Sequence, residues 1–300
     1  MKIRFPILLF ICCFFLTCKK DPPISKQVID DCDTTTIYPL RDTAYSNPRF
    51  NPNNPNEIIY TKTKKNSTET ILVKRNLVTG QETFIVSDIW QMPDWSVKDW
   101  IVFNHADNQV WKIKSNGDSL TLLTTNMQGG FDAVWSPDGN KIAYNMTRDP
   151  YTLICDENGS PLDSLPYQIN YLTQWSKDGN NICGLAKDYV NIAYQNIYTG
   201  QGHQPTNNAD NPDGSNIISS FAIGWLPNSQ DIIWSSWNGL YKTNIATNKT
   251  TLLKTICHNW RYYVSLSISP DGKKIIAERV DVPSGLCLMD IDGTNEVIIK

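Results

Sequence analysis

A five-residue pattern that recurs along the 300-residue chain restricts its fold more than any other feature. The pattern is Trp-Ser-Pro-Asp-Gly at residues 135–139, with close copies at residues 175–179 and 268–272 and looser copies elsewhere. The six copies begin at Phe50, Trp95, Trp135, Trp175, Trp225 and Ile268. Their spacings are 45, 40, 40, 50 and 43 residues. A period of about 40–45 residues is typical of the blades of a β-propeller.

The residues of this pattern are those of a tight turn between two strands. Proline fixes φ at about −65°, aspartate bonds to nearby backbone, and glycine adopts positive φ without strain. Each copy is followed by an apolar run that favours β-structure, and these runs contain Ile58, Ile101, Ile142, Ile182, Ile232 and Ile275. Every unit is therefore expected to contain a hairpin. The aromatic residue before the turn is expected to fill the space between neighbouring blades.

A second turn signal keeps the same period. It falls at residues 79–80, 116–117, 158–159, 199–200, 247–248 and 292–293. Two turns in each unit imply four strands, A to D in chain order, with the recurring pattern at the A–B turn. Residues 41–300 would hold six such units of about 43 residues. We predict an all-β fold, a six-bladed β-propeller of four-stranded antiparallel blades.

Two arrangements could close this ring. The first and last units each contain four strands of their own, so side-chain packing could hold them together. Alternatively, residues 36–38 (Thr-Ile-Tyr) could add an edge strand to blade 6, which is the arrangement we favour. Blade 4 is the least regular unit. Its outermost strand is expected within residues 201–205, followed by an Asn- and Asp-rich loop at residues 207–216.

The N-terminus has the composition of a bacterial lipoprotein signal. Lys2 and Arg4 precede an apolar stretch, residues 7–16, that is too short to span a bilayer comfortably. The stretch leads into Leu-Thr-Cys, which resembles a relaxed lipobox and makes Cys18 the expected lipidation site, with an ordinary secretory signal as the alternative. Lys19 after this cysteine favours the outer membrane. The expected domains are thus a signal peptide (1–17), a lipid-anchored polar tether (18–40) and the propeller (41–300).

Charge and cysteine content bear on other protein classes. The formal net charge of −3 shows no excess of positive charge of the kind that binds nucleic acid. Five cysteines follow Cys18, namely Cys32, Cys155, Cys183, Cys257 and Cys287. Their odd number and the lack of a Cys-x-x-Cys pair argue against a disulfide framework or a zinc site. Cys155, Cys183 and Cys287 are expected in the core, and a Cys257–Cys287 bridge stays open as an alternative.

Motifs of catalysis and metal binding are not found in the sequence. It has no Gly-x-Ser-x-Gly elbow, His-Glu-x-x-His, EF-hand loop or Walker-type loop. The three histidines, His105, His203 and His258, could face one rim of a propeller, as in a metal-dependent polysaccharide lyase. None has the spacing of metal ligands, and scattered surface histidines are the favoured interpretation. The sequence thus favours a protein without catalytic residues, cofactor or metal, and leaves the question of an enzyme open.

We expect ligands to bind at the rim formed by the B–C and D–A loops. This rim would carry Trp90, Asp94, His105, Asp107, Arg148, Asp149, Lys187, Asp188, Trp237, Trp260, Arg261, Arg279 and Asp281. Tryptophan and arginine often anchor interfaces, and tryptophan stacks on sugar rings. The candidate binding residues are Trp90, His105, Arg148, Trp237, Trp260 and Arg261. Packing of Trp90, Trp237 and Trp260 between blades is the alternative interpretation.

The Trp-Ser-Pro-Asp-Gly units resemble the TolB-like propeller repeat, a WD40-like Pro-Asp repeat. Lys-Ile-Ala-Tyr follows one copy at residues 141–144, and Lys-Lys-Ile-Ile-Ala follows another at residues 273–277. The resemblance covers most of residues 41–300, with three strong units and three weaker ones, and it implies a six-bladed propeller. TolB itself is a soluble periplasmic protein with an additional N-terminal α/β domain. This chain is expected to be lipid-anchored instead, which argues against a literal role in the Tol–Pal system.

Two functions follow as expectations. The first is a non-catalytic binding or scaffolding lipoprotein of the bacterial cell envelope, anchored through Cys18 and engaging an envelope protein or a peptidoglycan-associated partner. The second is a propeller that binds or cleaves glycan at the channel mouth. A cluster of acidic groups or histidines in the channel would favour the second function. A rim of exposed aromatic and arginine side chains would favour the first.

Overall fold

The computed structural model describes residues 42–300, apart from 91, 125–129, 147–150, 167–168, 207–217, 237–238, 257–261 and 281–284. Of residues 172–173 and 218–221 only the backbone is described. The predicted signal peptide (1–17), the tether (18–40) with Cys18, and the proposed closing strand at 36–38 lie outside these ranges.

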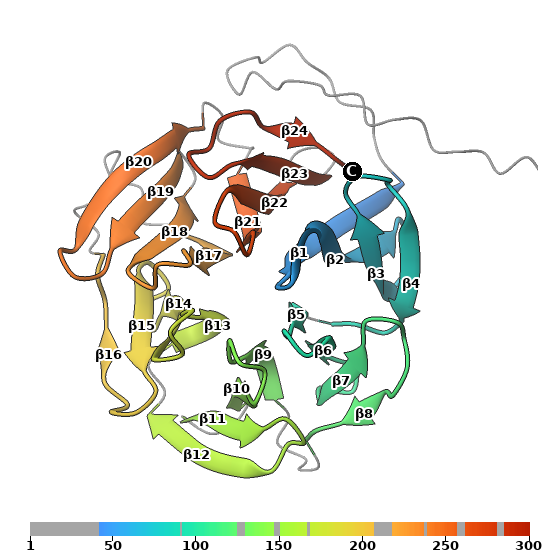
Figure 1. The fold of residues 1–300 in the computed structure, drawn as a ribbon, viewed down its shortest axis with the longest axis horizontal. Helices are drawn as coiled ribbons and strands as arrows, with labels where there is room; N and C mark the ends of the chain where they lie inside the picture. The colour runs from blue at the N-terminus through green and yellow to red at the C-terminus, as the bar shows by residue number, and fades with distance from the viewer. Residues whose placement is uncertain are drawn as a thin grey trace, which may run out of the picture.

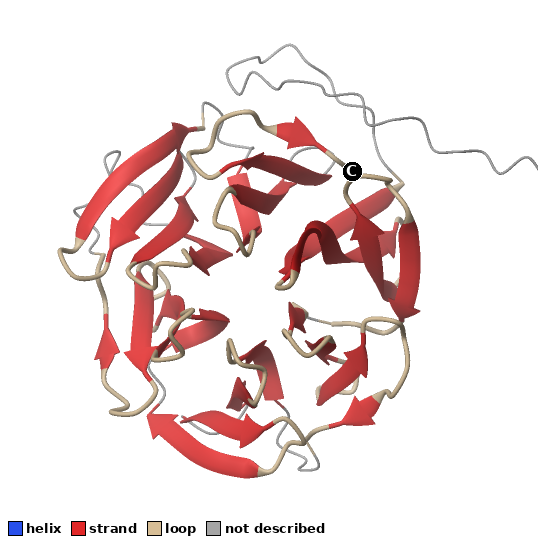
Figure 2. Ribbon diagram, viewed as in Figure 1, coloured by secondary structure: helices blue, strands red, loops and turns tan. Residues whose placement is uncertain are grey.

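Within the described ranges, twenty-four strands form six blades around a common axis, and no helix is present (Figures 1 and 2). The innermost strands are β1 (Thr43–Asn51), β5 (Asp94–Trp95), β9 (Gly130–Trp135), β13 (Ile169–Trp175), β17 (Ile218–Trp225) and β21 (Tyr262–Ile268). The second strands are β2 (Asn54–Lys64), β6 (Trp100–Asn104), β10 (Lys141–Met146), β14 (Asn181–Ala186), β18 (Asp231–Ser236) and β22 (Lys274–Val280).

The outer half of each blade is built in the same way. The third strands are β3 (Thr70–Asn76), β7 (Val110–Lys114), β11 (Tyr151–Asp156), β15 (Ile192–Asn196), β19 (Gly239–Asn244) and β23 (Gly285–Asp290). The outermost strands are β4 (Glu82–Val86), β8 (Thr121–Leu122), β12 (Pro161–Pro166), β16 (Gly202–His203), β20 (Lys249–Thr255) and β24 (Val297–Ile298). Neighbours within a blade pair antiparallel and in chain order, which confirms the predicted fold class. A single parallel pair, Phe221 with Ser265, joins blades 5 and 6.

The recurring pattern forms the A–B turn, as predicted. In blade 3 the Ser136 hydroxyl donates to Asp138 Oδ1 (2.6 Å) and accepts the backbone N–H of Lys141 (2.9 Å). Gly139 adopts φ +68°, which a side chain would strain. The same serine–aspartate bond recurs at residues 176–178 and 269–271. Burial alone would raise the pKa of Asp138, but the hydrogen bonds from Ser136 and Asn140 hold it below its usual value.

The second predicted turn, between strands C and D, is also present in all six blades. One residue of each turn adopts positive φ: Gly80, Gly117, Gly159, Gly200, Asn248 and Gly293. The outermost strand of blade 4 lies within the expected segment, at β16, and β24 forms the last strand of the ring. Turn chemistry therefore located strands as short as two residues.

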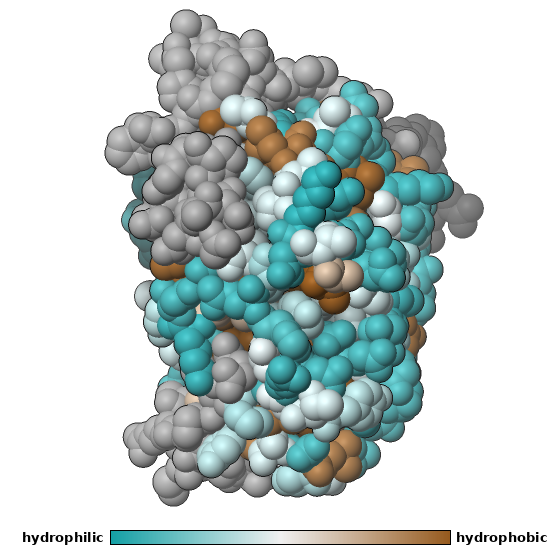
Figure 3. Space-filling view, turned by 90° about the vertical axis from the view of Figure 1, so that its left-hand side faces the viewer, coloured by the Kyte–Doolittle hydropathy of each residue, from teal (hydrophilic) through white to brown (hydrophobic). Residues whose placement is uncertain are grey.

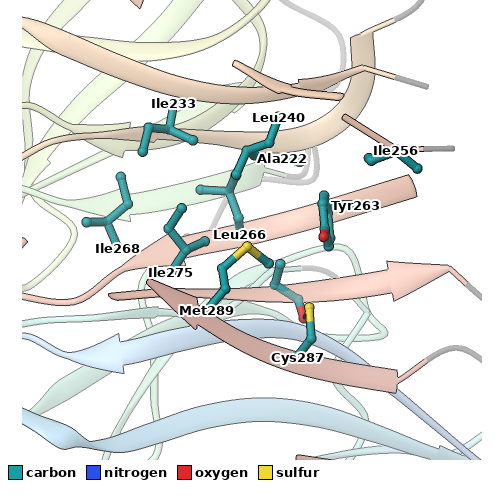
Figure 4. Packing of buried hydrophobic residues seen from close by; sticks show 11 residues of the cluster. Ala222, Ile233, Leu240, Ile256, Tyr263, Leu266, Ile268, Ile275, Cys287 and Met289 are labelled. Carbon is teal, nitrogen blue, oxygen red and sulfur yellow. Dashed lines mark hydrogen bonds between the residues drawn. The ribbon is translucent and has the colours of Figure 1, made fainter. Parts of the chain in front are cut away.

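The apolar core is divided into six clusters, and each lies between two neighbouring blades. Trp135 packs with Val102 of blade 2, and Trp175 packs with Val134 and Ile154 of blade 3. The aromatic residue before each A–B turn therefore fills the space towards the preceding blade, as predicted. Figure 4 shows the cluster between blades 5 and 6, where Ile268 takes this position and Met289 packs close by.

Blade 6 meets blade 1 through polar and apolar contacts. Strand β1 contacts β21, β22 and β23. Glu278 of β22 accepts the Ser46 hydroxyl (3.0 Å) and the backbone N–H of Asn47 (3.2 Å). Lys300 reaches Glu82 of blade 1 (2.6 Å). Burial raises the pKa of Glu82, but hydrogen bonds from Lys300 and Tyr60 outweigh it and lower the pKa to about 2. Within the described residues, packing of the two blades therefore closes the ring.

The outer flank of the propeller is mostly hydrophilic, with scattered apolar patches (Figure 3). Cys155, Cys183 and Cys287 are buried, as predicted for core residues. Cys287 donates to the Ala277 carbonyl, and Cys257 lies outside the described residues. The described part of the chain contains no helix that is long and apolar enough to cross a bilayer.

Candidate functional site

A cavity of about 120 Å³ opens on the propeller axis at the A–B turns. Its wall is formed by the aromatic residues at the ends of the innermost strands, among them Trp95, Trp135, Trp175 and Trp225. Proline side chains of the turns, such as Pro137, stand at its rim. The repeat therefore builds this cavity directly, because the same residue of every blade points to the same place.

The residues one position before these aromatic residues give the cavity its polar groups. In chain order they are Arg49, Asp94, Val134, Gln174, Gly224 and Ser267. The even-numbered blades carry Asp94, Gln174 and Ser267, and each of these side chains accepts a backbone N–H from the next blade. Asp94 Oδ2 accepts from Trp135 (2.7 Å), Gln174 Oε1 from Trp225 (2.7 Å), and Ser267 Oγ from Phe50 (3.2 Å). The inner ring is thus tied together at every second interface.

These bonds also fix which atoms remain for a ligand. Because Gln174 Oε1 is held by Trp225, its Nε2 must point elsewhere, and no bond to it is found among the described residues. A Cβ at Gly224 would lie only 2.9 Å from Leu266 Cδ1, so the glycine gives room to the leucine, and it leaves Gln174 Oε1 uncovered on that side. Asp94 Oδ2 is likewise held, and Oδ1, which faces Arg49, can still accept a hydrogen bond. The cavity therefore contains oriented polar groups from alternate blades.

Arg49 neutralises the carboxylate in this cavity. Its Nε lies 3.9 Å from Asp94 Oδ1, and both side chains are largely buried, with 7% and 17% of their surface exposed. Arg49 Nη1 donates to the carbonyls of Pro48 (3.0 Å) and Leu266 (3.1 Å). The guanidinium thus links blade 1 to blade 6 and stands beside the carboxylate of blade 2, so the pair brings no net charge.

Burial raises the pKa of Asp94 to about 6, although Arg49 and the N–H of Trp135 act in the opposite direction. Since the unfolded chain releases this proton at about pH 4, the folded protein binds more protons between these values. Lowering the pH from 7 to 5 should therefore stabilise the wild type by about 1 kcal/mol relative to Asp94→Asn. Urea unfolding of both proteins at both pH values measures this. Parallel pH profiles would contradict it, since other titrations cancel in the difference.

Three indole N–H groups near the cavity have no hydrogen-bond partner among the described residues. They belong to Trp135, Trp175 and Trp225, all buried. In blade 2 the corresponding group of Trp95 donates to Asp99 Oδ1 (3.2 Å), a residue of the A–B turn with positive φ. Glycine or serine holds the positive-φ position in blades 3 to 5 and offers no carboxylate. Because these three N–H groups are buried, the tryptophans that line the cavity contribute apolar surface to it.

The structure places only part of the predicted rim. Trp90 is 61% exposed, and its backbone N–H donates to the Asn104 carbonyl (2.8 Å), next to His105. The His105 ring lies 5.5 Å from that of Trp111. Trp90 is thus not packed between blades, and it shares this rim with His105. The other candidate rim residues, Arg148, Trp237, Trp260 and Arg261, lie outside the described residues and stay predictions.

Two residues expected at that rim lie elsewhere. Asp94 lines the cavity at the opposite end of the axis, because strand β5 has only two residues and Asp94 stands directly before the A–B turn. Arg279 is buried, with 3% exposure, and its Nη1 binds Glu296 Oε1 at 2.9 Å. His203 lies on the outermost strand of blade 4, stacked on Tyr194 at 5.0 Å, and is therefore far from the axis. His258 is outside the described residues.

Sequence reasoning missed the polar ring of Asp94, Gln174 and Ser267. The signal was positional: each residue directly precedes the repeated aromatic position in an even-numbered blade. Among the described residues, no group of three or more His, Cys, Asp or Glu side chains is arranged to hold a metal ion. The described cavity offers hydrogen-bonding groups and an apolar wall, which suits binding.

No family model and no curated protein matches the chain. Among solved structures, it is similar to a putative TolB from Agrobacterium tumefaciens, with 17% identity and a TM-score of 0.64, over 77% of this chain and 88% of that one. TolB from Acinetobacter baumannii matches at 15% identity and a TM-score of 0.43, over 85% and 54% of the two chains. An oligogalacturonate lyase in complex with manganese matches at 17% identity and 0.46, over 60% and 59%. The first likeness shows a shared fold, a TolB-like propeller.

Proposed function

We propose that this TolB-like propeller is a non-catalytic binding lipoprotein of the bacterial cell envelope, which engages a protein partner through its axial channel. The observation that carries the proposal is the cavity at the A–B turns. It joins an aromatic wall to polar groups that the neighbouring blades hold in place. Such a site is typical of an interface anchor, where a side chain of the partner enters a preformed pocket.

The envelope location rests on the N-terminal sequence. The basic residues Lys2 and Arg4, the apolar stretch and Cys18 support export and lipidation, and Lys19 supports the outer membrane. The membrane is then a partner of the chain through the lipid at Cys18, and nucleic acid is not. The protein partner would be another envelope protein or one associated with peptidoglycan.

Photo-cross-linking in intact cells tests both parts of the proposal. A photoreactive benzoylphenylalanine replaces Lys177, an exposed residue that lines the cavity, and a matched control replaces Leu162, which is 55% exposed on β12. We expect one defined protein adduct from position 177, none from 162, and loss of membrane attachment in Cys18→Ser. The same probe in place of Trp90 reports on the opposite rim. Absence of an adduct from both 177 and 90 would reject protein binding through the channel.

A second candidate, glycan binding, is favoured by one observation. The side chain of Trp90 is exposed, its backbone bonds to Asn104 next to His105, and exposed tryptophan stacks well on sugar rings. This rim lies at the other end of the axis from the cavity. Retention of the protein on immobilised peptidoglycan, if abolished by Trp90→Ala, would favour this candidate over the first.

A further inference from the structure

The cavity at the A–B turns offers a ligand a defined set of hydrogen-bond donors and acceptors. Asp94 Oδ1, which faces Arg49 Nε at 3.9 Å, can accept a further hydrogen bond. Gln174 Nε2 remains as a donor, because Asp94 Oδ2 and Gln174 Oε1 are held by the backbone of Trp135 and Trp225. The Ser267 oxygen accepts from Phe50, which leaves its hydroxyl hydrogen free to donate. Besides Arg49, whose charge is balanced by Asp94, a ligand on the axis therefore meets one acceptor and two donors.

The arrangement of these groups restricts the ligand further. They come from blades 2, 4 and 6, and alternate blades of a six-bladed ring lie a third of a turn apart. A primary carboxamide is planar and presents donor and acceptor sites in one plane from adjacent atoms. Its NH2 group can donate to Asp94 while its oxygen accepts from Gln174 and Ser267. A carboxylate has no donor for Asp94 and would compete with it for Arg49, and an ammonium group has no acceptor for Gln174 and Ser267.

Size and charge agree with this ligand. The cavity of about 120 Å³ accommodates a single side chain rather than a folded segment. Because Arg49 stands 3.9 Å from Asp94, the site is electrically balanced and gives no advantage to a cation. The indole and proline walls suit the flat faces of an amide.

We propose that the cavity binds the carboxamide side chain of an asparagine or glutamine at the tip of a partner polypeptide. The proposal rests on the proposed function and names the chemistry that its channel site recognises. Asp94 accepts a hydrogen bond from the NH2 group, and Gln174 and Ser267 donate hydrogen bonds to the carbonyl oxygen. A buried polar site of this kind discriminates against ligands that leave its groups unpaired.

Three capped peptides test the proposal on the full chain. Acetyl-Gly-Gln-Gly-N-methylamide is compared with the peptides that carry Glu or Met in place of Gln, in titrations followed by the tryptophan indole NMR signals. We expect the Gln peptide to bind at least about tenfold more tightly than either, since one lost hydrogen bond to a charged group already costs this much. Equal affinity for the three peptides would overturn the proposal, and this comparison needs no variant.

Two isosteric variants test whether Asp94 and Gln174 cause the preference for the Gln peptide. Asp94→Asn and Gln174→Glu keep the oxygen that accepts the N–H of Trp135 or Trp225, but each reverses the group offered to the ligand. We expect both to lose the preference for the Gln peptide. Gln109→Glu is the matched control, since its oxygen accepts the Thr124 hydroxyl (2.6 Å) away from the cavity and the preference should persist. Unfolding temperatures report whether each variant is folded.

The outcomes separate this proposal from the proposed function. A partner that cross-links at position 177 while the three peptides bind equally would leave protein binding in place and reject carboxamide recognition. A clear preference for the Gln peptide without any adduct in cells would support carboxamide recognition by the cavity and reject the binding of an envelope protein through the channel. If Asp94→Asn retains the preference, the assignment of the NH2 group to Asp94 is wrong.

Discussion

Replacing Trp175 with alanine is expected to lower the free energy of unfolding by about 3–5 kcal/mol, the range for removal of a large buried aromatic side chain. Trp175 is 4% exposed and packs among Val134, Ala143 and Ile154 of the preceding blade as well as residues of its own. The substitution would leave a cavity between two blades, where the surrounding strands cannot collapse. Urea unfolding measures the loss.

Two comparisons make this prediction specific. Trp135→Ala should have a similar effect, because Trp135 occupies the equivalent cluster between blades 2 and 3. Trp90→Ala should change stability by no more than about 0.5 kcal/mol, since that side chain is largely exposed. A loss for Trp175→Ala no greater than that for Trp90→Ala would show that the repeated aromatic residues do not hold the blades together.

Phenylalanine at position 175 gives a finer test of the same cluster. The indole N–H of Trp175 is buried and has no partner among the described residues, so its removal costs no hydrogen bond. Trp175→Phe should therefore retain more stability than its lost volume alone suggests. In blade 2 the indole N–H of Trp95 bonds to Asp99, and there the same substitution forfeits a bond.

The fold could be predicted because its information is local and repeated. A serine and an aspartate two residues apart, as in Ser136 and Asp138, set the turn through bonds within a few residues, and the glycine that follows supplies positive φ. Repetition of these signals at a constant period gave the number of blades and strands. It located even β16, a strand of two residues that composition alone would not indicate.

The polar groups of the channel could not be predicted in the same way. The position before each aromatic residue varies from arginine to glycine, so the repeat conceals that these side chains meet on one axis. The contacts that close the ring could not be predicted from local sequence either. Glu278 meets Ser46 across 232 residues of sequence, and only the completed ring brings them together. Such contacts depend on tertiary geometry and have no local signal.

A buried charge cluster between blades 5 and 6 was also not predicted from the sequence. Arg279, which belongs to it, had been expected at the binding rim. Glu296, whose side chain is 2% exposed, accepts Arg279 Nη1 at 2.9 Å and Lys254 Nζ at 2.6 Å. The Tyr263 hydroxyl donates to the same carboxylate at 3.0 Å. Burial raises the pKa of Glu296, but the two cations outweigh it, so the net shift is downward. The carboxylate thus compensates positive charge from two blades.

Removal of this carboxylate should have the second large effect. Glu296→Ala would leave the Arg279 and Lys254 charges without it in a buried site, and we expect a loss of about 3–5 kcal/mol in urea unfolding. The pair Glu296→Leu with Arg279→Met removes the carboxylate together with the more deeply buried of its two cations, and Lys254, whose side chain is 15% exposed, keeps its charge. This variant should recover part of the loss. Because this explanation is electrostatic, a double variant no more stable than Glu296→Ala would contradict it. The contact would then act through packing and not through charge.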